Sequence, residues 1–312
     1  MLAVKRLRDL HLDPTTHPRG LAYLSAASGL VQVQERLYVV ADDEHHFAVF
    51  DLVPQGVGRL IRLFEGDLPE SAKKRKAHKP DVEALAQLPA FPGCPSGALF
   101  ALGSGSRPNR NTGVLMTLGP DGSVKGAVQH IDLTPLYASL RDQFTEINIE
   151  GALAGADELL LLQRGNKGGS ANACIRFAWT AVLPWLLGQS AAALEPTALQ
   201  RYDLGAVEGV PLCFTDGAAL PGGAWVFSAV AENVGDSYND GASIGTSIGV
   251  VDAAGTLQTM RALMSNFKVE GIAAHLDGDA LTLTLVTDAD DAAIPSQLLS
   301  ASLSYSDAIS TA

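Results

Sequence analysis

The sequence predicts an all-β fold, a β-propeller with five blades, because a short phrase recurs along the chain. The phrase is an oxygen-bearing residue, then a tiny residue, then an apolar residue. Its five occurrences begin at Ser28, Glu83, Glu150, Asp216 and Glu270. Each is followed by a run rich in strand-forming residues, and successive phrases lie 54 to 67 residues apart. A near-constant period longer than a hairpin is typical of repeat architectures. We therefore expect each repeat to be one blade and each phrase to begin the innermost strand.

The first blade shows the expected strands, at residues 29–33, 36–41, 47–52 and 57–64. Residues 3–12 alternate loosely and predict a strand that pairs with the last run, 297–303. This pairing would close one blade with both chain ends and would remove exposed sheet edges. A closed ring of this kind makes residues 1–312 a single domain. Six blades is the alternative, if residues 177–204 contain a degenerate repeat.

Two short helical insertions are expected between strands. Residues 134–144 have Thr134 as a helix N-cap and Pro135 in the first turn. Residues 184–199 are rich in alanine and leucine. By contrast, residues 65–80 contain prolines, a serine and several lysines, so they predict a solvated loop. Residues after 303 are expected to be frayed.

The composition excludes several classes of protein. The chain has 312 residues and a net charge of -12, whereas a nucleic-acid-binding domain normally has a basic surface. Its three cysteines show neither a disulfide framework nor zinc spacing. The first residues lack the apolar core of a signal peptide, and no apolar run approaches the length of a membrane span. We expect a cytoplasmic protein, a monomer or weak dimer, that binds a small molecule and neither membranes nor nucleic acid.

The recurring phrase also predicts a metal site, because the innermost strands of a propeller start close to its axis. Four carboxylates and one hydroxyl would meet there. Two unit charges about 5 Å apart repel by roughly 3 kcal/mol even at an effective dielectric of 20. Protonation, basic partners or a cation must compensate. Calcium accepts six to eight oxygen ligands, magnesium requires a stricter octahedron, and the lack of His and Cys disfavours zinc or copper. Calcium is therefore the expected ion, and magnesium is second.

The order Ser, Glu, Glu, short oxygen ligand, Glu on five inner strands resembles the calcium-activated nucleotidases, the apyrase family of five-bladed propellers. Residues 28–30 and 37–43, with the pair Asp42 and Asp43, look like that family's first blade, and residues 268–272 look like its last. The resemblance implies that Ser28, Glu83, Glu150, Asp216 and Glu270 bind a central calcium. The family has Ser where this chain has Asp216, so Thr215 is the alternative ligand. The Glu-Gly phrases are also similar to phytase-like and esterase-like bacterial propellers.

Loops at the channel mouth are the expected substrate site. Arginine forks suit phosphate oxygens, a metal polarises a phosphoryl or carbonyl oxygen, and a nearby carboxylate can act as a base. The predicted catalytic residues are Asp43, Arg107 and Arg164, and the predicted substrate-binding residues are Asp42, Lys79, Arg110, Lys167 and Glu232. The leading hypothesis is a calcium-dependent hydrolase of a phosphate ester or anhydride. The alternatives are a non-enzymatic propeller with a structural ion that binds a small ligand or a protein, and a lactonase- or esterase-like metal propeller.

Overall fold

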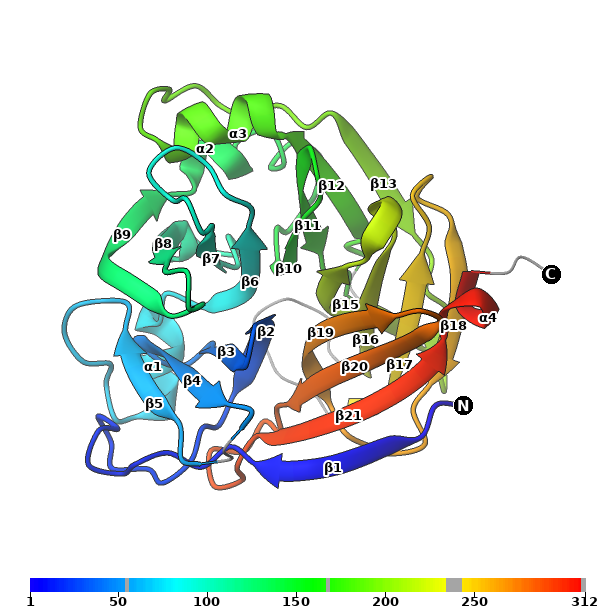
Figure 1. Ribbon diagram of the computed structural model, residues 1–312, viewed down its shortest axis with the longest axis horizontal. Helices are drawn as coiled ribbons and strands as arrows, with labels where there is room; N and C mark the ends of the chain where they lie inside the picture. The colour runs from blue at the N-terminus through cyan, green and yellow to red at the C-terminus, as the bar shows by residue number, and fades with distance from the viewer. Residues whose placement is uncertain (54–55, 167–168, 234–242, 310–312) are drawn as a thin grey trace.

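Five antiparallel sheets surround a common axis in the computed structural model of the chain (Figure 1). The structure describes residues 1–53, 56–166, 169–233 and 243–309. Strands β2, β6, β10, β15 and β19 are the innermost of their sheets and neighbour one another around the axis. The predicted all-β, five-bladed propeller is therefore confirmed. Residues 177–204 do not form a sixth blade, because they contain the end of β12, a helix and all of β13 of the third blade.

Each blade is a meander of consecutive strands. Blade one contains β2 (Ala27–Val33), β3 (Arg36–Ala41), β4 (His46–Asp51) and β5 (Arg59–Arg62). Blade two contains β6 (Val82–Leu88), β7 (Ala98–Gly103), β8 (Thr112–Leu118) and β9 (Val124–Asp132). Blade three contains β10 (Ile149–Ala154), β11 (Glu158–Gln163), β12 (Asn172–Ala178) and β13 (Ala198–Tyr202). Blade four contains β14 (Ala206–Val207), β15 (Val210–Ala219), β16 (Trp225–Glu232), β17 (Ser243–Val251) and β18 (Leu257–Ala262).

Blade five closes the ring with both ends of the chain. It contains β19 (Val269–Asp277), β20 (Ala280–Thr287), β21 (Gln297–Ser304) and the N-terminal strand β1 (Val4–Asp9). Strand β1 runs antiparallel to β21, with Val4 opposite Ala301 and Asp9 opposite Gln297. Figure 1 shows these two strands side by side in blue and red. The predicted closure is confirmed, and the backbone pairing of β1 covers the outer edge of β21.

Four short helices connect or follow the strands. They are α1 (Ala72–His78), α2 (Thr134–Tyr137), α3 (Trp179–Leu186) and α4 (Tyr305–Ile309). Helix α2 falls in the insertion that the sequence predicts. Helix α3 begins before the predicted range 184–199, because Trp179, Val182 and Trp185 are the residues that pack into the core between blades two and three. No helix in the described ranges is both long enough and apolar enough to cross a bilayer.

Two segments that we expected to be irregular are helical. The solvated loop predicted for residues 65–80 is wrong in its second half, where α1 forms and buries the side chain of Arg75. Alanine, lysine and arginine all favour helices, so the residues of α1 have a local preference for the helix that forms. The contact of Arg75 with a partly buried partner stabilises this helix. The expectation of fraying after residue 303 is also wrong up to residue 309. There Asp279 accepts hydrogen bonds from the Ser304 hydroxyl at 2.7 Å and the Ser306 N–H at 2.6 Å.

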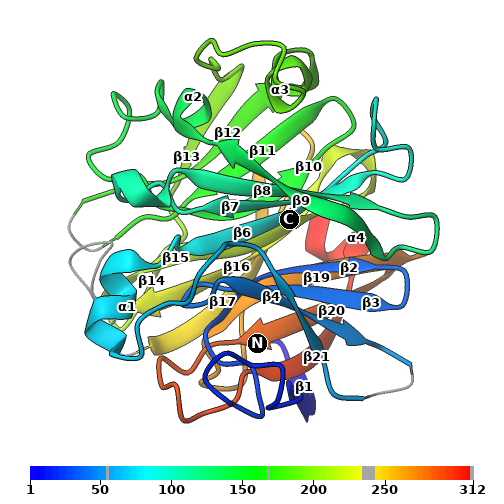
Figure 2. The ribbon, with the colours of Figure 1, turned by 90° about the vertical axis from the view of Figure 1, so that its left-hand side faces the viewer.

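The hydrophobic core is divided among the five gaps between neighbouring blades. In β3, Leu37 and Val39 pack toward blade five, whereas Tyr38 and Val40 pack toward blade two. Both faces of such a strand are buried, so its sequence is continuously apolar rather than alternating. Figure 2 shows the strands running across the ring from one face to the other, with α1 at one face. The candidate site lies at this α1 end of the channel.

Candidate ligand site at the channel mouth

A β-bulge occurs on each innermost strand at the recurring phrase. The pairing of β6, β10 and β19 with their neighbours skips Glu83, Glu150 and Glu270, respectively. In blade one the skipped residues are Ser28 and Gly29. A bulge inserts an unpaired residue and re-aims its side chain. The phrases therefore place equivalent side chains at the same height of the channel.

In blade four, the bulged residue lies one position earlier than the recurring phrase predicts. The bulge on β15 lies at Thr215, so Asp216 takes the position that glycine or alanine has in the other blades. Its buried carboxyl group accepts hydrogen bonds from the N–H groups of Leu30 at 3.2 Å, Ile272 at 3.0 Å and Gly217 at 2.8 Å. The Thr215 hydroxyl donates to the Val269 carbonyl at 2.8 Å. Both predicted blade-four ligands are thus engaged by other parts of the protein.

A second repeated position directly follows the second strand in blades one, two, three and five. The backbone N–H there donates to the carbonyl two residues before the bulged residue. The pairs are Asp42 to Ala26 at 3.2 Å, Ser104 to Asp81 at 2.9 Å, Arg164 to Asn148 at 2.8 Å and Asp288 to Lys268 at 3.1 Å. In these four blades, three positions therefore face the mouth together: the bulged residue, the residue two before it, and the residue after the second strand.

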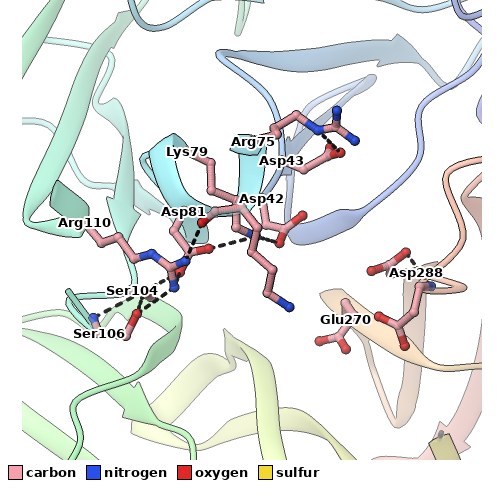
Figure 3. Close-up of polar contacts among 12 residues, drawn as sticks. Asp42, Asp43, Arg75, Lys79, Asp81, Ser104, Ser106, Arg110, Glu270 and Asp288 are labelled. Carbon is pink, nitrogen blue, oxygen red and sulfur yellow. Dashed lines mark hydrogen bonds and ion pairs between the residues drawn. The ribbon is translucent and has the colours of Figure 1, made fainter. Parts of the chain in front are cut away.

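One side of the mouth is an acidic trio made of Asp42, Asp81 and Glu83, whose nearest carboxylate oxygens all lie within 4.8 Å of one another. The Lys79 ammonium contacts Asp42 and lies 2.8 Å from Asp81, and Arg110 lies 2.6 Å from Asp81 (Figure 3). Burial opposes the charge on Asp81, yet Lys79 and Arg110 hold its pKa below the ordinary value.

Glu83 is the exception in the acidic trio. Within the described ranges, its carboxyl group has no hydrogen bond or ion pair with a protein group. Burial, and then the carboxylates of Asp81 and Asp42, raise the pKa of Glu83 well above its ordinary value. Lys79 favours the charged form of Glu83 but supplies too little positive charge to offset these effects. An added cation or a proton would supply the missing positive charge.

The opposite side of the mouth is a salt-bridge cluster around Arg164. The guanidinium contacts Glu232 and lies 3.3 Å from Glu150 and 3.7 Å from Glu270. Lys268 lies 3.1 Å from Glu270 and 3.4 Å from Glu232. These two basic side chains favour the charged forms of Glu150 and Glu270, yet burial raises the pKa of Glu150 to about 7 and that of Glu270 above its ordinary value. Of the five predicted metal ligands, Glu150 and Glu270 therefore lie in this salt-bridge cluster, and Glu83 lies in the acidic trio.

A cavity of about 190 Å³ lies beside the acidic trio, under α1 and between blades one and five. Asp42, Asp43, Arg75, Lys79 and Asp288 are among its lining residues. One oxygen of Asp43 accepts a hydrogen bond from Arg75 Nε at 3.0 Å, whereas the other is buried and has no partner in the described part of the chain. Burial, together with Asp42 and Glu44, raises the pKa of Asp43 to about 6. This pKa suits a group that exchanges a proton near neutral pH.

The backbone is strained around this cavity. Ala26, Asp81 and Asp290 have positive φ angles of 55°, 57° and 53°, a conformation that costs energy in residues with a Cβ atom. The described residues contain only two other non-glycine residues of this kind, Gln34 and Glu208. Strained residues cluster at ligand sites because the surrounding structure must hold them in place. Their distribution therefore points to this end of the channel.

The remaining predicted residues lie in different environments. Arg107 is exposed and precedes the short 3-10 turn Pro108–Arg110. Arg110 is buried against Asp81 and Ser106, and Glu232 is buried against Arg164 and Lys268. Lys167 lies outside the described residues. The structure thus brings Asp42, Asp43 and Lys79 together at one cavity and places Arg164 and Glu232 across the mouth.

Four residues of the mouth were not predicted from the sequence as site residues: Arg75, Asp81, Lys268 and Asp288. A signal existed for three of them. Asp81 and Lys268 each lie two residues before a recurring phrase, and Asp288 directly follows a second strand as Asp42 does. Arg75 gave no such signal, because it belongs to a helix outside the repeat.

These observations define a five-bladed propeller with an acidic, partly compensated mouth and an adjoining cavity. The chain belongs to a family of unknown function, DUF6929, whose model matches residues 23–303. No curated protein matches the chain in sequence.

Several solved structures are similar to it in fold. A luciferin-regenerating enzyme matches at 10% identity over 95% of each chain, with a TM-score of 0.42. A chain of a nidogen/laminin complex matches at 10% identity over 91% of this chain and 87% of that one, with a TM-score of 0.41. The β-propeller domain of Cps50 (Swd1) from Myceliophteria thermophila matches at 11% identity over 85% and 66%, with a TM-score of 0.35. The resemblance to nucleotidases and phytase-like propellers gains no specific support from these matches.

Proposed function

We propose that this chain is a divalent-cation-dependent hydrolase that acts on a small molecule at the channel mouth. The observation that carries the proposal is the juxtaposition of Asp43, with one unpartnered oxygen, and the acidic trio, in which Glu83 lacks a partner. A cation and a proton acceptor are the two groups that metal-assisted hydrolysis requires. Both would adjoin the cavity under α1.

The residues of the acidic trio fit a hard cation. Asp42, Asp81 and Glu83 offer only oxygen atoms, which suits calcium or magnesium better than zinc or copper. The raised pKa of Glu83 is the mark of a carboxyl group that a cation would stabilise in its charged form. Lys79 contacts two of these carboxylates, so an ion would share them with the ammonium. Calcium is our first choice because carboxylates and waters satisfy its flexible coordination.

The ion, when bound, would supply charge that polarises the scissile phosphoryl or carbonyl group. Asp43 is the proposed base, and the part of its carboxyl group that lines the cavity would accept the proton of the attacking water. Arg75 holds the other oxygen at 3.0 Å and so fixes the orientation of the carboxyl group. Lys79 and Arg75 would bind anionic groups of the substrate at the cavity wall.

The leading substrate class is a phosphate ester or anhydride, because Arg75, Lys76 and Lys79 line the cavity from α1 and the loop that follows it. A carboxylic ester or lactone is the second class. The specific observation in its favour is that Arg110 and Arg164, which the sequence predicted to act on a phosphate substrate, are engaged by Asp81 and by three glutamates. An ester or lactone carbonyl does not need those arginines.

A substrate panel tests the proposal. The wild type is assayed with 4-nitrophenyl phosphate, pyrophosphate, 4-nitrophenyl acetate and a γ-lactone, in calcium, in magnesium and with a chelator. We expect hydrolysis of one class in calcium, loss of activity with the chelator, and a fall in kcat of at least about a hundredfold in Asp43→Asn. The matched control, Asp67→Asn, changes an exposed carboxylate outside the cavity. Absence of turnover with all four substrates, or full activity in Asp43→Asn, would contradict the proposal.

A further inference from the structure

A larger cavity of about 640 Å³ adjoins the small cavity under α1. It lies between blades four and five, and its lining includes the start of β17, the end of β20 and the segment between β20 and β21. Asp288 and Asp290 line both cavities, so the two spaces meet at these residues. The volume falls within the range of about 300–1,000 Å³ that small-molecule sites occupy.

The lining of the larger cavity combines apolar and polar groups. Phe267, Ile294 and Pro295 supply apolar surface, and Ile294 is 43% exposed at the rim. Ser243 Oγ and Gln297 Oε1 are buried, and neither has a hydrogen-bond partner in the part of the chain that the structure describes. Buried polar atoms without partners are rare in folded proteins. Lys268, Asp288 and Asp290 add charged groups to the same lining, so the cavity offers both apolar contacts and hydrogen-bonding partners.

We infer that this larger cavity binds the non-reacting body of the substrate, while the scissile group lies in the small cavity beside Asp43. The inference rests on the proposed function and names its substrate class. The substrate is an ester or phosphate ester of an aromatic or alicyclic alcohol that carries hydrogen-bond donors, rather than an inorganic polyphosphate. The apolar part would contact Phe267 and Ile294, and a hydrogen-bond donor would reach Asp288. Binding energy from such a remote part can position the reacting group.

Matched pairs of substrates test the inference through Ile294. The pairs are 2-naphthyl phosphate with methyl phosphate, and 2-naphthyl acetate with methyl acetate. We expect Ile294→Glu to raise KM for the active naphthyl substrate about tenfold, with less than a twofold change for its methyl partner. Ile294→Leu should restore the wild-type KM. The control is Met264→Glu, because Met264 is 60% exposed and does not line either cavity.

A binding titration separates this inference from the hydrolase proposal. The probe is 2-naphthol, which cannot be hydrolysed, and the readout is its fluorescence. Binding to the wild type and to Met264→Glu, with at least a tenfold weaker Kd in Ile294→Glu, would support the cavity even if no substrate is turned over. In that case only the hydrolase proposal fails. No 2-naphthol binding to the wild type, or equal KM changes for naphthyl and methyl substrates, would overturn the inference.

Discussion

Asp43 lies where its own charge is unfavourable, and this conflict is what suits it to proton transfer. Burial and the neighbouring Asp42 and Glu44 oppose ionisation, whereas Arg19 and Arg75 favour it only in part. The net effect raises the pKa to about 6 from an ordinary value of 3.8. A group that serves only the fold gains nothing from such a position. Sites that bind and react commonly sacrifice stability in this way.

The raised pKa of Asp43 predicts a dependence of stability on pH. The folded protein holds this proton more tightly than the unfolded chain does, so the stabilisation is complete below pH 3.8 and is lost as the pH rises through about 6. Asp43→Asn removes the titration. We therefore expect the free energy of unfolding of Asp43→Asn, relative to wild type, to increase by roughly 2 kcal/mol between pH 4 and pH 8.

Urea denaturation across this pH range, with chelator present, measures the effect on Asp43. The control is Asp67→Asn, which changes an exposed carboxylate outside the cavity. A constant difference for Asp43→Asn would show that the Asp43 carboxyl group is not destabilised by its surroundings. The proposed role of Asp43 as a base would then lose its physical support.

At the scale of elements, the inner strands approach one another closely at the axis. A Cβ atom added to Gly271 would lie 2.5 Å from the Ser28 carbonyl oxygen, and one added to Gly29 would lie 2.9 Å from the Glu83 carbonyl oxygen. Blade four has Asp216 at this position instead of a small residue. Its carboxyl group accepts N–H groups from β2 and β19, so one side chain links three inner strands.

We expect Asp216→Ala to be strongly destabilising. The change leaves the N–H groups of Leu30 and Ile272 buried without acceptors, and each such group costs about 1–3 kcal/mol. The free energy of unfolding should therefore fall by about 2–5 kcal/mol. The matched control is Asp203→Ala, because Asp203 also accepts a backbone N–H, from Gly205 at 2.9 Å, but is exposed. A loss for Asp216→Ala no larger than that of the control would show that the axial link contributes little.

The elements also show how far the sequence could predict the site. The repeat could place Ser28, Glu83, Glu150 and Glu270 on equivalent strands, because their phrases share one pattern. It could not decide between Thr215 and Asp216, since two oxygen-bearing residues are adjacent there and only the bulge distinguishes them. Helix α1 was not predicted. Its Arg75 donates a hydrogen bond to Asp43, which is 32 residues away in the sequence, so the local sequence does not show this stabilising contact.

At the scale of the molecule, the ring geometry could be predicted and the charge pairing could not. A constant period with strand-forming runs requires a repeat fold, and closure by β1 and β21 follows from it. Acidic residues from several blades lie together at the mouth, in a chain whose net charge is -12. Which of them are compensated depends on where Arg164 and Lys268 point, and that is a property of the folded structure. In the acidic trio, Glu83 is the member without an ion pair or hydrogen bond among the described residues.

A calcium titration that follows the melting temperature tests the proposed cation site at the acidic trio. The proteins compared are metal-stripped wild type, Glu83→Gln and Glu158→Gln. Glu158 is the control because it pairs with Arg176 away from the mouth. At a hundredfold excess over Kd, a ligand adds about 2.7 kcal/mol to stability. We predict a rise of several degrees in wild type and Glu158→Gln, greater than with magnesium, that is lost in Glu83→Gln. No rise in wild type, or an equal rise in all three proteins, would contradict a cation site at the acidic trio.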